Sequence, residues 1–148
     1  MFITKIRVAY LVYKAAVLQG RGELEKVIAA AERILLLDPA SLPALFLLAE
    51  NCIHVRSYAR AEQVLEEALR LHPETAHFHV LLAQVRERMG KPAETFLPHL
   101  RAYRDARRKT RSRRRREGDS TVTAEILKAR ESLDAWAEEV LHREETRD

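Results

Sequence analysis

The chain is poor in the residues that build disulfides, tight turns and membrane spans. Its 148 residues include one cysteine, four glycines and five prolines. A single cysteine excludes an intrachain disulfide and a multi-cysteine metal site, and so few glycines and prolines do not supply the turns of an all-β fold. The apolar stretches at residues 8–18 and 42–49 are shorter than a membrane span. Leu, Ala, Glu and Arg dominate instead, and these helix formers predict one all-α domain.

The first residues look only superficially like a signal peptide. Lys5 and Arg7 precede an apolar run, but Lys14 interrupts that run and its residues follow a helical spacing. Both features argue against cleavage and export. The lone cysteine, Cys52, also fits a reducing compartment. The expected location is therefore the cytoplasm.

The positive net charge comes from one short segment. The chain carries +4, yet residues 107–116 hold eight Lys or Arg among ten positions. Outside this segment, 18 basic residues face 22 acidic ones, and residues 117–148 are acidic. The basic character is thus a property of one run and not of the folded body.

Prolines and glycines recur at one period along the chain. Pro39 and Pro73 stand 34 residues apart and end similar phrases, while Gly22 and Gly90 are separated by 68 residues. In the unit between them the corresponding place falls on Arg56, where a turn is still expected. Each period divides into two patterns in which apolar residues recur at steps of three and four. The period predicts stacked pairs of helices.

The middle unit has the most regular pattern. Its key places are filled in order by Leu45, Leu48, Ala49, Cys52, Ala61, Leu65, Ala68 and Pro73. This order resembles the tetratricopeptide repeat, a helix–turn–helix of 34 residues, with Cys52 in place of the usual aromatic residue. The resemblance implies an α-α superhelix of about three helix pairs, in which Leu48, Ala61 and Leu65 meet in one interior.

The flanking units are less regular. The first has Lys14 where the family has leucine, and the third has His79 and Arg86 at places that are normally apolar. Pro98 is expected to kink a helix over residues 92–106. Degenerate end repeats are common, because an end unit has only one neighbour.

After the basic run the sequence predicts one more helix. Asp119 or Ser120 is its expected N-cap. Apolar residues then follow at steps of four and three: Val122, Ile126, Ala129, Leu133, Trp136 and Val140. Such a stripe caps the end of the solenoid or binds a partner, and capping is favoured. The expected organisation is a repeat domain over residues 1–106, a basic segment over 107–118 and a terminal helix over 119–148.

The sequence has no recognisable catalytic or cofactor-binding motif. It lacks a phosphate-binding glycine loop, a nucleophile elbow and a paired-histidine zinc motif. His77 and His79 point to different faces of a predicted helix, His72 lies beyond a turn, and no further ligand completes a metal set. We interpret them as loop and groove histidines, and Cys52 as a small core residue. The prediction is a non-enzyme without cofactor, metal or small-molecule substrate.

The resemblance also implies a ligand-binding surface. In this family the first helix of each pair lines a concave face, where ligands usually lie. The matching positions, expected to bind a peptide or helix of another protein, are Val12, Ala16, Gln19, Phe46, Glu50, Ile53, His54, His77, Val80, Gln84 and Glu87. This groove is mainly apolar with scattered acids, which suits apolar anchors. Alternatively, a terminal helix of the chain itself fills it.

Two subtypes of the family bear on the ligand. Members that clamp the acidic C-terminus of cytosolic chaperones use basic and amide side chains, but the matching places here are Val12, Ala16, Leu47, His77 and Leu81. A carboxylate buried there would be unpaired, which is costly, so this activity is rejected. Small three-repeat chaperones of secretion systems agree in length and groove, although the basic run departs from their pattern.

The basic run is the second candidate site. Its members are Arg107, Arg108, Lys109, Arg111, Arg113, Arg114, Arg115 and Arg116. Such a run can bind nucleic-acid phosphates or anionic lipid headgroups through charge, but without aromatic residues it does not read bases. The alternative is a solvated helix, partly neutralised by the acidic C-terminal segment. Two hypotheses remain: a protein-binding adaptor, chaperone or assembly factor acting through the groove, and an RNA-, ribonucleoprotein- or membrane-associated module acting through the basic run.

Overall fold

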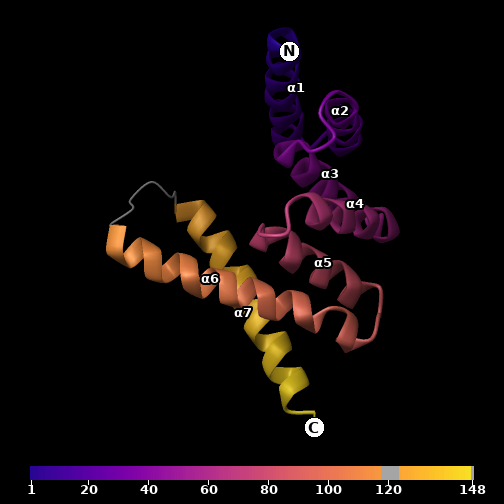
Figure 1. Cartoon of the computed structure of the whole chain (residues 1–148). Coiled ribbons are helices and arrows are strands. Elements are labelled where there is room, and N and C mark those ends of the chain that lie inside the picture. Colours follow the sequence, from indigo (N-terminus) through magenta and orange to yellow (C-terminus); the bar gives the residue numbers. More distant parts are fainter. Residues whose placement is uncertain (118–123, 148) are drawn as a thin grey trace.

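A computed structural model of the chain describes residues 1–117 and 124–147. Within these ranges all regular structure is helical, which confirms the all-α prediction (Figure 1). The elements are α1 (Phe2–Gly20), α2 (Leu24–Leu37), α3 (Leu42–His54), α4 (Tyr58–Leu71), α5 (Ala76–Arg88), the 3-10 helix η1 (Ala93–Thr95), α6 (Leu97–Glu117) and α7 (Ala124–Glu145). None of the described helices is long and apolar enough to cross a membrane.

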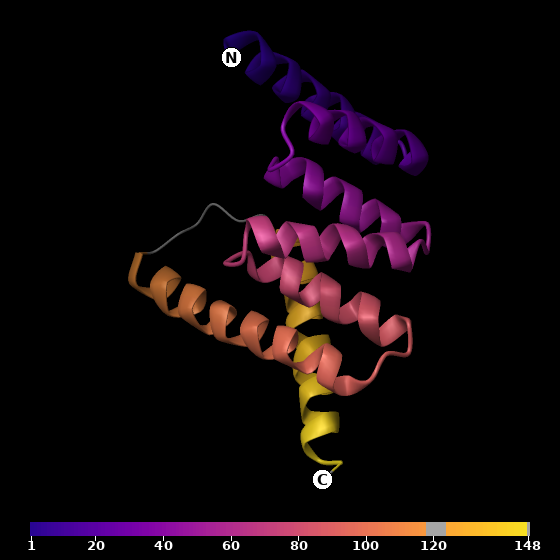
Figure 2. The ribbon, with the colours of Figure 1, turned by 45° about the vertical axis from the view of Figure 1, so that its right-hand side comes forward.

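The first six α-helices stack as the pairs α1/α2, α3/α4 and α5/α6 (Figures 1 and 2). Leu48, Ala61 and Leu65 meet in the central interior, as the repeat pattern predicts. Ala49 and Ala68 are fully buried beside them, because small side chains let neighbouring helices approach closely. The repeat period thus corresponds to one continuous core under the stacked pairs.

The turn inside each helix pair has the same backbone shape. Gly22, Arg56 and Gly90 all have positive φ, at 73°, 60° and 69°. In each turn the next amide donates to a carbonyl five residues back, from Glu23 to Leu18 at 3.1 Å, from Ser57 to Cys52 at 2.8 Å and from Lys91 to Arg86 at 3.0 Å. This is the Schellman end of a helix, in which glycine is favoured at the left-handed position. Arg56 occupies that position in the middle unit, where the sequence predicts a turn.

The third pair corrects one prediction. No helix begins at residue 92. Instead η1 covers Ala93–Thr95, and Pro98 lies in the first turn of α6. Proline is tolerated there because the first-turn amides have no helical partner, so the expected kink at Pro98 is wrong. Helix α6 then continues to Glu117, and the expected boundary between residues 106 and 107 lies inside it.

Helix α7 crosses α6 steeply at the end of the stack (Figure 2). Val140 and Leu141 are buried against α5 and α6, and Leu133 and Trp136 pack at the edge of the same cluster. The terminal helix therefore caps the solenoid. The expected N-caps Asp119 and Ser120 lie outside the described residues, as does Val122.

Candidate partner-binding groove

Helices α3 and α5 line a groove of about 760 Å³. Five of the residues predicted for the concave face contribute to its lining, namely Glu50, Ile53, His54, His77 and Gln84. They come from the first helices of the second and third units, because these helices lie side by side in the stack. These five predicted residues therefore lie together at one hollow, and their role in binding stays a prediction.

Five further residues line the groove and were not assigned to it from the sequence. They are Arg56, Tyr58, Leu81, Arg88 and Leu133. Leu81 is one of the concave positions named for the chaperone clamp. Arg56 lies in the turn before α4, Tyr58 is the first residue of α4, and Leu133 comes from α7. The Arg88 guanidinium lies 6.0 Å from the centre of the Tyr58 ring. Glu50 is the one carboxylate in this lining, so the two arginines make the wall more basic than predicted.

Phe46 forms part of the groove's supporting wall. Its ring stacks on His77 with centroids 4.6 Å apart and approaches Phe78 at 5.1 Å. The imidazole Nε2 of His77 lies 3.4 Å from Glu50 Oε1. Phe46 is half-buried and packs against the central core, so truncating it would disturb the fold as well as the groove.

Helix α7 covers two positions that were predicted to face a partner. Val80 is fully buried in a cluster with Ala137, Val140 and other residues of α6 and α7. Glu87 accepts a hydrogen bond of 2.8 Å from Nη2 of Arg143 in α7. The prediction that Val80 faces a partner is therefore wrong, because the apolar face of α7 packs on α5 and α6. Glu87 stays 26% exposed beside this contact. The terminal helix occupies part of the concave face and leaves the groove beside it.

The three predicted residues of the first unit lie away from this groove. Val12 lines a separate hollow of about 1000 Å³ between α1 and the turn from α2 to α3. Ala16 is exposed and Gln19 is half-buried, and neither lines the hollow or the groove. Val12 and the groove residues therefore line separate hollows.

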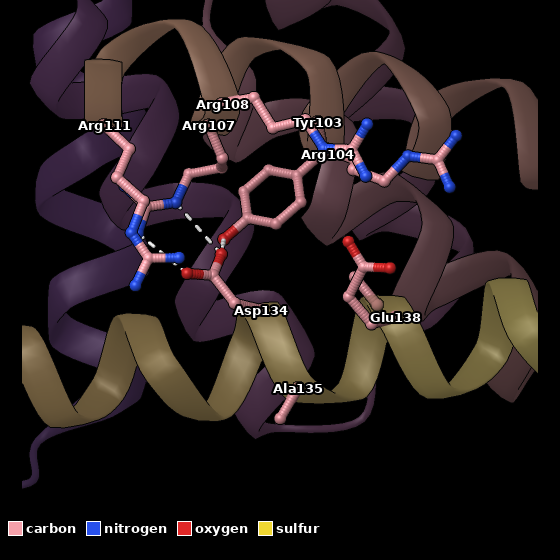
Figure 3. Close-up of a pocket in the computed structure, with 9 residues that line it drawn as sticks. Tyr103, Arg104, Arg107, Arg108, Arg111, Asp134, Ala135 and Glu138 are labelled. Atoms are coloured by element: carbon pink, nitrogen blue, oxygen red, sulfur yellow. Dashed lines mark hydrogen bonds and ion pairs between the residues drawn. The ribbon is translucent and has the colours of Figure 1, made fainter. Parts of the chain in front are cut away.

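The basic run starts at an ion pair with α7 (Figure 3). Asp134 accepts hydrogen bonds from Tyr103 Oη at 2.7 Å, Arg107 Nε at 3.0 Å and Arg107 Nη2 at 2.8 Å. Partial burial acts to raise the pKa of the Asp134 carboxyl, but the hydrogen bonds from Arg107 and Tyr103 outweigh it and leave this pKa below its ordinary value. Burial, and then the bond to Asp134, raises the pKa of Tyr103.

A pocket of about 370 Å³ adjoins this ion pair, lined by Arg104, Arg107, Arg108, Arg111 and parts of α7. Further along α6, the side chains of Arg108, Lys109, Arg111 and Arg113 are exposed. The backbone at Arg114, Arg115 and Arg116 is helical, but their side chains lie outside the described residues. The basic run thus forms the second half of α6, and its first arginine, Arg107, is bound to Asp134 of the capping helix α7.

The histidines take part in the packing of the repeats. His72 Nε2 lies 2.8 Å from the carbonyl of Ala40. His79 bridges two groups, with Nδ1 at 3.0 Å from His99 Nδ1 and Nε2 at 3.0 Å from the carbonyl of Pro73. In the part of the chain that the structure describes, no three His, Cys, Asp or Glu side chains gather as a metal site needs.

One tautomer assignment satisfies this histidine chain. Arg86 Nη1 donates to His99 Nε2 at 3.2 Å, so the proton of a neutral His99 is on Nδ1 and is donated to His79. His79 then donates from Nε2 to Pro73. Burial, with smaller contributions from His79 and Arg86, lowers the pKa of His99 to about 4. Burial therefore keeps His99 neutral in this arrangement.

Comparison with known proteins agrees with the fold. The sequence model of the tetratricopeptide repeat family matches residues 18–85. An O-GlcNAc transferase mutant from Thermobaculum terrenum is 25% identical with a TM-score of 0.64, over 70% of this chain and 20% of that one. YrrB, described as a TPR protein with an unusual peptide-binding site, is 26% identical with a TM-score of 0.57, over 66% of this chain and 53% of that one.

MamA from Desulfovibrio magneticus RS-1 shares the fold, at 18% identity and a TM-score of 0.62, over 93% of this chain and 76% of that one. The chain spans 20% of the transferase and 53% of YrrB, so it corresponds to only part of each. No curated protein matches the sequence significantly.

Proposed function

Because residues 18–85 match the sequence model of the tetratricopeptide repeat, we propose that the chain is a non-enzymatic interaction module that holds a peptide or helix of another protein in the groove between α3 and α5. Its role is that of an adaptor, chaperone or assembly factor in the cytoplasm. The observation that carries the proposal is the groove of about 760 Å³, which α3 and α5 line beside Leu133 of the capping helix.

The lining of the groove indicates the kind of peptide that fits. Ile53, Leu81 and Leu133 supply apolar surface, and Arg56 and Arg88 supply two cations. A peptide with an apolar anchor next to a carboxylate would place the anchor against this surface and pair its charge with a guanidinium. A similar structure, YrrB, is described as having a peptide-binding site, which supports the same class of ligand.

Filling the groove tests the proposal. Gln84 is half-buried in the lining, so Gln84→Trp should occupy the space with an indole ring and block the peptide. Gln63→Trp is the matched control, because Gln63 is exposed on α4 and does not line the groove. Peptides selected from a display library on the wild-type protein should bind the Gln63→Trp variant normally and lose at least about tenfold affinity for the Gln84→Trp variant. Equal affinity for both variants would refute groove binding.

A second proposal concerns polyanions. Arg108, Lys109 and Arg111 are exposed on α6, and clustered cations of this kind attract phosphate groups through counterion release. Affinity for RNA or for vesicles containing phosphatidylserine should fall steeply as the salt concentration rises. Measuring RNA and vesicles in separate experiments would distinguish nucleic acid from lipid as the ligand. Arg108→Gln with Arg111→Gln should weaken this binding, while Arg70→Gln on α4 should not. An affinity indifferent to salt contradicts the proposal.

A further inference from the structure

Helix α1 carries an exposed apolar seam. Ile3, Ile6, Tyr10, Tyr13 and Val17 recur at alternating steps of three and four, so they form one line along the helix. Their exposed fractions are 72%, 54%, 62%, 70% and 37%. Isolated exposed apolar residues are ordinary on a protein surface, but a continuous line of them is typical of an interaction site.

The rest of the stack uses the same positions to hold neighbouring helices. In the second unit, Ala44 corresponds to Tyr10 and is fully buried. In the third unit, Phe78 corresponds to Tyr10 and Val85 to Val17, and both are fully buried. Phe78 and Val85 belong to the central core, which also contains residues of α3 and α4. Tyr10 and Val17 of the seam therefore hold positions that are buried in a later unit, but no described helix covers them.

A small hollow, here called the notch, lies beside the seam. It has a volume of about 380 Å³ and lies between α1 and α2. Its lining is Arg7, Tyr10, Leu11, Arg33, Leu36 and Leu37. Leu36 is 84% exposed and extends the apolar surface of Tyr10 and Leu11 at the notch. One apolar side chain from a docked helix would fit between the two helices there.

The charges carried by α1 itself have one sign, although Asp38 lines the neighbouring hollow together with Tyr13. Helix α1 contains Lys5, Arg7 and Lys14 and no acidic residue. Arg33 of α2 adds a fourth cation at the notch. None of these four side chains forms a salt bridge with any residue in the described ranges. A partner with carboxylates along its flanks would pair with them.

We propose that the α1 seam and its notch form a docking surface for an acidic amphipathic helix of another protein. The seam is a narrow line of the coiled-coil type, which matches one helix better than the broad apolar face that lipid surfaces require. A second copy of α1 is a poor partner, since it would bring cations against cations. This site is on the terminal face of the stack and is separate from the groove between α3 and α5.

A designed peptide tests the proposal on the full chain. The probe has about three heptads, with leucine at the seam positions and glutamate at the flanking positions. A second peptide carries lysine in place of each glutamate. Fluorescence anisotropy should show binding of the glutamate peptide to the wild-type protein and much weaker binding of the lysine peptide. The double substitution Tyr10→Ser with Tyr13→Ser should weaken binding of the glutamate peptide, because the apolar contact with the seam is lost.

Charge exchange supplies the decisive control. Arg7→Glu with Arg33→Glu should weaken binding of the glutamate peptide by about tenfold or more and remove most of its advantage over the lysine peptide, because the two new carboxylates balance Lys5 and Lys14. Both arginines are exposed, so the fold should persist, and Arg101→Glu on exposed α6 surface is the matched control. Gln84→Trp should leave the glutamate peptide unaffected. The proposal would be overturned if the wild-type protein bound both peptides equally, or if Gln84→Trp lost binding of the glutamate peptide. It would also be overturned by a dimer that depends on α1, or by anionic vesicles that displace the peptide.

Discussion

Replacing Asp134 with alanine should loosen the capping helix. Asp134 accepts two hydrogen bonds from Arg107 and one from Tyr103. Hydrogen bonds to charged groups contribute about 1.5–3 kcal/mol each when buried. The side chains of Arg107 and Asp134 are 28% and 35% exposed, so solvent weakens the pair. We expect Asp134→Ala to make the docking of α7 less favourable by about 2 kcal/mol.

The only tryptophan of the chain reports this docking directly. Trp136 lies in α7 and packs at the edge of the cluster formed with α5 and α6. With a urea dependence of about 2 kcal/mol per molar, the midpoint of its fluorescence transition should fall by roughly 1 M. Glu139→Ala is the matched control, because Glu139 is an exposed acid of the same helix without a salt bridge to any described residue. Identical midpoints for the two variants would refute the role of Asp134.

The same ion pair predicts an acid-dependent docking. The folded pKa of Asp134 is below its ordinary value of 3.8. Its contribution is therefore complete above the ordinary pKa and is lost as pH falls through the folded pKa. The wild-type midpoint should converge on that of Asp134→Ala below about pH 4. A constant difference down to strongly acidic pH would contradict this reasoning.

Three other expectations concern single positions. The pKa of His99 is lowered to about 4, so stability should decline by about 1 kcal/mol from pH 7 to pH 5, and His99→Gln should remove most of that decline in urea unfolding. Arg56→Gly should raise the free energy of unfolding by about 0.5–1 kcal/mol, because glycine relieves the positive φ of 60°, whereas Gly90→Ala should lower it by about 1 kcal/mol. Burial raises the pKa of the Cys52 thiol, so thiol reagents should label it only at the rate of unfolding, and fast labelling of the native protein would contradict the core assignment.

The sequence predicts the repeat interior well because its signals are local and periodic. Leu48, Ala61 and Leu65 recur at helical spacing, and their meeting in one core follows from a helix pair of standard length. Arg56 could be placed in a turn because it stands midway between two glycines of the same period. A regular repeat thus makes the packing of one unit informative about the next.

The parts that the sequence did not predict depend on contacts between distant segments. Val80 lies on the concave side of its own helix, and its burial by α7 has no periodic signature. Leu133 joins the groove for the same reason. The expected kink at Pro98 is wrong because η1 precedes α6, so this proline lies in the first turn of α6 and not inside a helix that starts at residue 92. Contacts between residues of different repeat units, or between a repeat and α7, are therefore what the sequence pattern did not predict.

Helix α6 has 21 residues, and the repeat core and the basic run share it. A helix of this length extends for about 30 Å without a hinge. The exposed cations therefore keep a fixed direction and separation from the concave face, as a flexible arginine tail would not. Two molecules held at these places at the same time would be oriented toward one another by the helix itself.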